Sequence, residues 1–274
     1  MDQASAAGDR VSASARLVLA PNAGPMTLDG TNSYVLRAPD SEGVVVVDPG
    51  PSDPAHLARL SGAGRVELVL VTHHHPDHTE SLEAFHAMTD APVRAIDPAF
   101  CLAGAPLVDG ERIRAAGLEI DVIATPGHTA DSVCFSLPGD RFLDSGETRG
   151  TVLTGDTILG RGTTIIADPD GALGPYLDSL GRLAALGAPG PVGVLPGHGP
   201  VLPDLAAICR AYLAHRAERL DQVRAALREL GADASTAAVT DLVYADTDAS
   251  VRSAAEASVR AQLAYLQHAP HSSE

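Results

Sequence analysis

A histidine-rich heptapeptide at residues 72–78 limits the folds open to this chain more than any other feature. Its sequence is THHHPDH, so it holds four of the eleven histidines together with an aspartate. It directly follows an apolar run at residues 69–71, which is typical of a buried strand. Loops at strand tips commonly carry function, because a rigid sheet positions them. Imidazole and carboxylate side chains together suit zinc and related transition metals.

The same arrangement recurs three times further along the chain. Each time, an apolar run leads into a glycine-bearing turn that offers one more ligand: first His128, then Asp156, then His198. A histidine-rich run by itself is also typical of a solvated loop or of an adventitious metal-binding tract. Four strand tips that all offer ligands favour one shared metal site instead.

The order of these residues resembles the metallo-β-lactamase superfamily of metal-dependent hydrolases, in the pattern HxHxDH at 73–78 followed by His128, Asp156 and His198. The resemblance covers the chain up to about residue 200. More narrowly, GPMTLDGTNSY at 24–34 and GDTILGRGTT at 155–164 resemble the β-lactamase-like protein 2 subgroup. The resemblance implies the α/β (α+β) class and an αββα sandwich. In that subgroup a small helical, winged-helix-like domain follows.

The resemblance also implies a dinuclear metal site, in which Asp77 would orient the nucleophile besides binding metal. We expect two Zn²⁺ ions per chain, with iron or manganese as alternatives, and a metal-bound hydroxide as the nucleophile. Asp48, at the end of a valine strand, would anchor the ligand histidines through their free N–H groups. The ligands would be His73, His75 and His128 for one metal, Asp77, His78 and His198 for the second, and Asp156 between them.

Other residues near this loop are less tied to the pattern. In an extended segment His74 alternates away from its neighbours, so we do not expect it to bind metal. Many superfamily members carry a glycine pair where this chain has TES at 79–81. Asn32 and Tyr34 could line the pocket and bind the substrate.

We expect a disordered N-terminus at 1–13, a catalytic domain at 14–204 and a helical, winged-helix-like domain at 205–274. Helical periodicity extends from 205 to Gly231, Ser235 can cap a second helix, and residues 251–266 can form a third. Few residues then remain for a wing hairpin. Arg216 and Arg219 are among five arginines on the long helix. They indicate either a solvated helix face or a stripe that contacts substrate or phosphate.

Composition indicates the cellular compartment and the kinds of partner that this chain can have. The net charge is −16, every basic residue is arginine, and broad attraction to nucleic acid is disfavoured. The three cysteines are far apart and lie in apolar surroundings, which indicates free thiols in a reducing compartment. No signal segment or membrane span is evident, so we expect a cytoplasmic protein with no membrane partner.

The reaction is therefore expected to be hydrolysis of a small-molecule acyl or thioester substrate by a dinuclear metallohydrolase. Cleavage of single-stranded RNA by an endoribonuclease is the alternative. A third hypothesis, from another class, is a non-hydrolytic metal-binding or redox protein whose tail binds a partner or forms a homodimer. The fold itself serves many reactions, so the substrate cannot be predicted from it.

Overall fold

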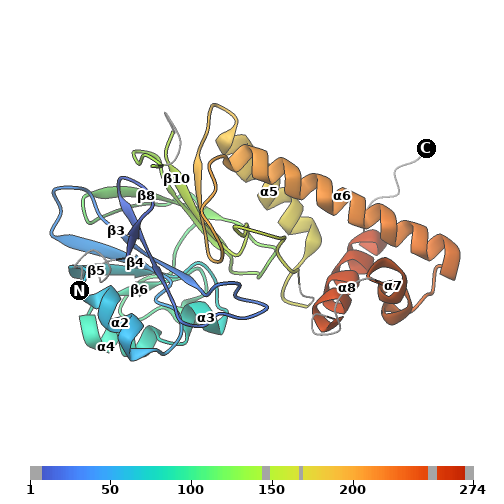
Figure 1. The fold of residues 1–274 in the computed structure, drawn as a ribbon, viewed down its shortest axis with the longest axis horizontal. Helices are drawn as coiled ribbons and strands as arrows, with labels where there is room; N and C mark the ends of the chain where they lie inside the picture. The colour runs from blue at the N-terminus through green and yellow to red at the C-terminus, as the bar shows by residue number, and fades with distance from the viewer. Residues whose placement is uncertain (1–7, 144–148, 167–168, 246–251, 269–274) are drawn as a thin grey trace.

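The structure is a computed structural model that describes residues 8–143, 149–166, 169–245 and 252–268. Two β-sheets stack against each other, and helices cover their outer faces (Figure 1). This arrangement confirms the predicted αββα sandwich. The six strands of the first sheet are, in spatial order, β1 (Asp9–Arg10), β2 (Ala15–Leu19), β3 (Asn32–Leu36), β4 (Gly43–Val47), β5 (Arg65–Leu70) and β6 (Val93–Arg94).

The second sheet is built from the middle of the chain. Its β10 and β11 run parallel, and its other neighbouring strands run antiparallel. The five strands are, in spatial order, β11 (Gly193–Pro196), β10 (Thr151–Gly155), β9 (Val133–Leu137), β8 (Leu118–Ala124) and β7 (Arg112–Ala115).

The valines of β4 show how the sequence encodes a strand between two apolar layers. Val45 and Val47 pack against the second sheet in the inner core. Val44 and Val46 point the other way and pack under helices α2 (Pro54–Ser61) and α4 (Leu82–Thr89). Because successive side chains alternate between the faces, a strand buried on both faces becomes an unbroken apolar run.

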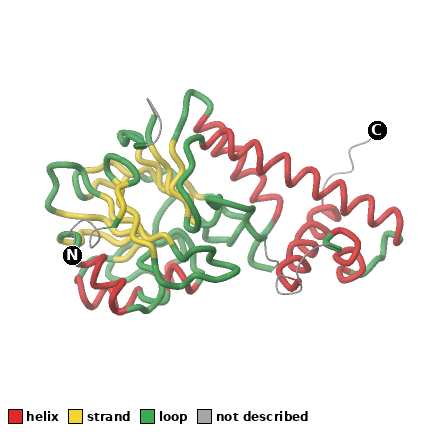
Figure 2. Tube along the Cα trace, in the orientation of Figure 1, coloured by secondary structure: helices red, strands yellow, loops and turns green. Residues whose placement is uncertain are grey.

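Helices α5 (Leu173–Gly187) and α6 (Leu205–Leu230) cover the outer face of the second sheet. Val152 and Val194 of that sheet share a core cluster with Leu180 and Leu183 of α5 and with Tyr212 of α6. Helix α6 is long enough to extend beyond the sandwich, where α7 (Thr236–Val243) and α8 (Arg252–His268) pack against it (Figure 2).

The predicted helical C-terminal part is confirmed. As predicted, Ser235 caps α7, where its hydroxyl accepts a hydrogen bond from the Ala238 N–H. Residues 205–245 and 252–268 contain no strand, so a wing hairpin is not found within these two ranges.

The prediction of a disordered segment at 1–13 is wrong for its second half. Residues Asp9 and Arg10 pair with β2, and Ser12 is fully buried. The Ser12 hydroxyl accepts hydrogen bonds from the N–H groups of Ser14 and Ala15, which anchors this segment although its composition is polar. Residues 1–7 lie outside the described ranges.

Two sheet edges meet at the end of the sandwich that carries the predicted ligands. The carboxyl ends of β4 and β5 lie side by side because these strands are parallel, and so do those of β10 and β11. The N–H of Asn32 donates to the Gly197 carbonyl across the two sheets. Among the described residues no helix is long and apolar enough to span a bilayer, and Cys101, Cys134 and Cys209 are free thiols.

Candidate metal centre

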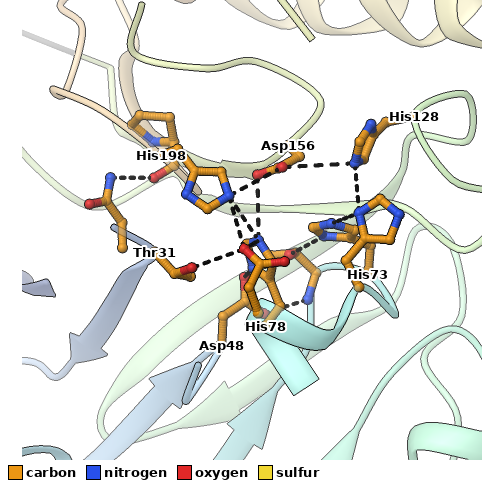
Figure 3. A network of polar contacts seen from close by, with 12 residues as sticks. Thr31, Asp48, His73, His78, His128, Asp156 and His198 are labelled. Atoms are coloured by element: carbon orange, nitrogen blue, oxygen red, sulfur yellow. Dashed lines mark hydrogen bonds and ion pairs between the residues drawn. The ribbon is translucent and has the colours of Figure 1, made fainter. Parts of the chain in front are cut away.

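The heptapeptide at 72–78 leaves the tip of β5 and turns into α3 (Pro76–Thr79). His75 is the N-cap residue of α3, and Pro76 begins the helix, where its fixed φ is favourable. The chain therefore presents His73 and His75 from an extended segment and Asp77 and His78 from a helical turn. Figure 3 shows His128, Asp156 and His198 reaching the same point from the second sheet.

Three histidines form the first ligand cluster. The Nε2 atom of His73 and the Nδ1 atom of His75 lie 3.0 Å apart, and His128 Nε2 lies 3.1 Å from the same Nδ1 atom. His73 is buried, whereas His75 and His128 border the opening of the site. Three nitrogens therefore converge on one point that solvent can reach.

The second cluster combines one carboxylate with two imidazoles. Asp77 Oδ2 lies 3.3 Å from His78 Nε2 and 3.1 Å from His198 Nε2, and the two nitrogens are 3.3 Å apart. Asp156 lies between the clusters, with its Oδ2 atom 3.3 Å from His198 Nε2 and 3.8 Å from His128 Nε2. The structure thus brings together all seven predicted ligands.

The outward nitrogen of each ligating ring is held by a fixed acceptor. His78 Nδ1 donates to Asp48 Oδ2 at 2.8 Å, and His198 Nδ1 donates to the Gly30 carbonyl at 3.1 Å. His128 Nδ1 donates to a backbone carbonyl at 2.8 Å. In the neutral form of each of these three rings the proton stays on the outward nitrogen, so the inward nitrogen offers a lone pair to a metal once His78 and His198 have lost their second proton.

These lone pairs provide a test of whether metal ions fit the site. Facing lone pairs about 3 Å apart repel each other unless a cation lies between them. Tetrahedral zinc with bonds of about 2.0–2.1 Å separates its ligand atoms by about 3.3 Å, close to the spacings in both clusters. The buried Asp156 Oδ1 atom also has no hydrogen-bond partner. The donor set therefore fits two transition-metal ions of the zinc or iron type.

The charges of the two clusters differ. Burial and the neighbouring His128 lower the pKa of His75 to about 4, and burial followed by the charge of His78 lowers the pKa of His73 well below its usual value, so both rings are neutral at pH 7. Burial opposes protonation of His198 too, but hydrogen bonds to Asp156 and Asp77 outweigh it and raise its pKa to about 9. The pKa of Asp77 is far below its usual range despite burial, because His198 and His78 donate to it. The carboxylates are ionised whenever metal could bind.

Asp48 anchors this region, as predicted from the sequence. It is buried, and its Oδ1 atom accepts the Thr72 N–H at 2.8 Å. Its Oδ2 atom accepts the Thr72 hydroxyl at 2.6 Å in addition to the His78 N–H. The Thr72 hydroxyl in turn accepts from His73 Nδ1 at 3.0 Å. One carboxylate therefore orients a ligand of each cluster.

A contact that the sequence did not reveal holds Asp77. The Thr31 hydroxyl donates to Asp77 Oδ2 at 2.9 Å, and it accepts from Asn22 Nδ2 at 2.9 Å. Asn22 Oδ1 also accepts the Thr31 N–H at 2.8 Å. Thr31 lies within the motif at 24–34, but no local pattern pairs it with a residue 46 positions away.

Asn32 and Tyr34, predicted to bind substrate, have a different role. Both are 2% exposed, so neither is available to a substrate in this structure. Asn32 Nδ2 donates to the Pro196 and Gly199 carbonyls, each at 2.8 Å, and the Tyr34 hydroxyl donates to the Pro196 carbonyl at 2.8 Å. They fix the turn that carries His198, in addition to the backbone bridge between Thr31 and His198.

The two arginines singled out on the long helix lie close to the metal loops. Arg216 is only 4% exposed, donates to the Thr164 carbonyl and stacks 5.2 Å from the Tyr176 ring. Arg219 is half-buried and stacks 4.8 Å from the Tyr244 ring. The interpretation of a solvated helix face is therefore wrong for Arg216, whereas Arg210, Arg224 and Arg228 are exposed.

His74 turns away from the seven ligands, as its alternation predicts. Its Nδ1 atom lies 2.8 Å from Asp131 Oδ1, on the outer side of the loop. Where many superfamily members have glycines, the Thr79 hydroxyl donates to the His74 and His75 carbonyls, and Glu80 accepts the Ser52 N–H. These side chains support the loop and do not enter the metal clusters.

Comparison with known proteins gives a consistent result. The sequence profile of the "Metallo-beta-lactamase superfamily" matches residues 26–198. "Lactamase-like protein aptB" of Emericella nidulans is 34% identical over 77% of this chain and 65% of its own length. "Beta-lactamase-like protein 2 homolog" of Caenorhabditis elegans is 30% identical over 94% of this chain and 85% of its own. The match thus leaves about a third of the fungal relative uncovered.

Solved structures agree with the fold. A metallo-beta-lactamase family protein from Thermus thermophilus superposes with a TM-score of 0.73 at 23% identity, over 93% of each chain. A protein solved in a di-iron-bound form, TTHA1623, has a TM-score of 0.52 at 27% identity, over 66% of this chain and 92% of its own.

Proposed function

Because the chain belongs to the metallo-beta-lactamase superfamily, we propose that it is a metal-dependent hydrolase that cleaves a thioester or ester. One observation carries this proposal. Two clusters of candidate ligands, one of three imidazoles and one of a carboxylate and two imidazoles, share Asp156 between them. Structural zinc sites are usually closed by four ligands and rich in cysteine, and no cysteine ligates here. The arrangement is that of a catalytic pair.

The metals and the protein contribute separately to this chemistry. A bound metal pair supplies Lewis acidity and lowers the pKa of water from 15.7 to about 7. Asp77 is ionised over the whole neutral range, so its carboxylate can orient the attacking water and accept a proton from it. Thr31 holds that carboxylate at Oδ2. In the overall reaction, the water oxygen bonds to the acyl carbon, the carbon–sulfur bond breaks, and the thiol leaves with a proton.

Charge supports an acyl substrate over RNA. At a net charge of −16 the chain would repel a polyanion over most of its surface. A small thioester needs no such footprint. Zinc is the metal that we propose, and the related di-iron structure makes iron the alternative to test.

The test combines metal content with turnover on one sample. Elemental analysis should give about two metal ions per chain, and a generic thioester should be hydrolysed faster than a fluorescent single-stranded RNA. His75→Ala should abolish turnover, whereas His86→Ala, which removes a histidine remote from the clusters, should not. RNA cleavage without thioester turnover would replace this proposal with a nuclease. Iron with no hydrolysis of either probe would indicate the non-hydrolytic class.

A further inference from the structure

A second, separate cavity lies beside the metal centre. It has a volume of about 220 Å³ and lies where the loop at 163–165 faces helices α6 and α8. Figure 1 shows α8 beside α6, beyond the end of the sandwich. The cavity is lined by residues that include His215, Arg216 and Arg219 of α6, Tyr244 after α7, and Ser258 of α8.

The lining is basic in a strongly acidic protein. Among the residues that the structure describes, the lining contains two arginines and a histidine but no aspartate or glutamate, although the chain has 35 acidic residues and only 19 basic ones. The carboxylates nearby on α7 and α8, Asp241 and Glu256, are both paired with Arg252. Nothing in the lining therefore neutralises the two guanidinium groups.

Two lining atoms are buried without partners. Arg216 Nε and His215 Nδ1 are inaccessible to solvent and form no hydrogen bond. Burial, followed by the charges of Arg216 and Arg219, lowers the pKa of His215. A buried charge with unsatisfied donors is unfavourable unless a ligand completes it.

The cavity and the metal centre share one loop. The Thr164 carbonyl accepts from Arg216, while the Thr164 hydroxyl donates to the Asp156 carbonyl at 2.7 Å. The next residue, Ile165, accepts the His128 Nδ1 proton at 2.8 Å. One molecule could therefore contact both places, since only this short loop separates the arginines from two metal ligands.

We propose that this cavity binds a phosphate group carried by the substrate, away from the bond that is cleaved. The planar guanidinium fork matches the oxygens of phosphate, and charge-assisted hydrogen bonds are about twice as strong as neutral ones. Ser258 and Thr163 add hydroxyl donors. The inference rests on the proposed function for the cleaved bond, and it names the substrate class as a thioester whose thiol part is phosphorylated.

The first experiment measures sulfate binding to the metal-loaded protein by calorimetry, with chloride at equal ionic strength as the reference. Arg219→Gln removes the charge and keeps a shorter polar side chain, and Arg216→Lys keeps the charge and removes the fork. We expect each to weaken sulfate binding about tenfold or more. Arg224→Ala, on the exposed side of the same helix, should bind sulfate like the wild type. Equal affinity in all four proteins would overturn the anion site, because sulfate would then bind only at the metals or adventitiously.

The second experiment compares S-acetylpantetheine with its 4′-phosphate, which differ by one phosphate group. We expect kcat/KM to be about tenfold higher for the phosphate ester, Arg219→Gln should abolish that preference, and the exposed Arg224→Ala should keep it. Equal kcat/KM for both would refute the phosphorylated substrate class. Arginine-dependent sulfate binding without turnover of either would uphold the anion site and refute the thioester hydrolase. Turnover of both thioesters, together with sulfate binding that does not depend on the arginines, would uphold the thioester hydrolase and refute the anion site.

Discussion

Replacing Asp48 by asparagine should weaken one metal position more than the other. In the wild type His78 Nδ1 donates to Asp48 Oδ2. An amide has one oxygen, and that oxygen is needed by the Thr72 N–H, which Asp48 Oδ1 accepts at 2.8 Å. The amide NH₂ would then face His78 Nδ1. That nitrogen would have to accept, which moves the ring proton to Nε2, the nitrogen that faces the metal.

The expected loss can be estimated from this change. Removing the outer partner of a ligating histidine typically costs about 10–100-fold in metal affinity, or about 1.4–2.7 kcal/mol. Asp48 has a φ of 52°, in the left-handed region that asparagine also tolerates, so backbone strain should not add to the loss. The cluster of Asp77, His78 and His198 should weaken more than the first cluster, because His73 depends on Asp48 only indirectly, through the Thr72 hydroxyl.

The assay is a chelator competition that resolves two metal ions per chain, followed by kcat at saturating metal. Asp140→Asn is the matched control. Asp140 is also a buried carboxylate: it accepts the Ser14 N–H at 2.9 Å and the Thr151 hydroxyl at 2.7 Å. Unlike Asp48, it contacts none of the candidate metal ligands. If Asp48→Asn kept both affinities, or if Asp140→Asn lost metal equally, the tautomer argument would be refuted.

Three further predictions concern other parts of the molecule. Asp77→Ala and His75→Ala should each abolish hydrolysis while circular dichroism stays near wild type, and full residual activity in either would contradict the dinuclear site. Because His198 has a pKa of about 9 and must lose its proton to bind metal, metal binding should release protons at pH 7. The affinity for metal should fall by up to about tenfold for each pH unit below 9. Calorimetry in two buffers of different ionisation enthalpy measures this release, and finding none would contradict the prediction. Gly127→Ala should destabilise the fold by several kcal/mol in urea titration, since φ is +144° and the new Cβ would lie 2.3 Å from Tyr176 Cα.

The metal ligands were predictable from the sequence because each depends on a local pattern. An apolar run predicts a buried strand, and the residue after it must lie at the tip of that strand. Such a run precedes each of His128, Asp156 and His198. These residues are far apart in the chain, but strands that run in the same direction bring their tips together, so the prediction does not depend on sequence spacing. The helix cap at Ser235 was equally local.

The anchors and the cavity were not predictable in this way. The motif at 24–34 predicts Asn32 and Tyr34 as substrate contacts because it lies near the site, but the stacking of the two sheets buries them against the His198 turn. On helical spacing alone, Arg216 cannot be told from the exposed Arg224, since both are arginines on the same helix. What separates them is the packing of α5 and α8 against α6, which no periodicity reports.

This difference bears on how the chain could acquire a particular substrate. The ligands are set by strand ends that the whole sandwich requires, so changing them would disturb the metal site in any member of the fold. The loop at 163–165 and the arginines of α6 lie outside those strands, and Thr164 joins them to Asp156 through single hydrogen bonds. Substitutions there can alter what is bound beside the metals without altering the metals themselves. We therefore expect substrate choice to follow the residues that face the basic cavity, and exchanges of Arg216 or Arg219 to change KM more than metal content.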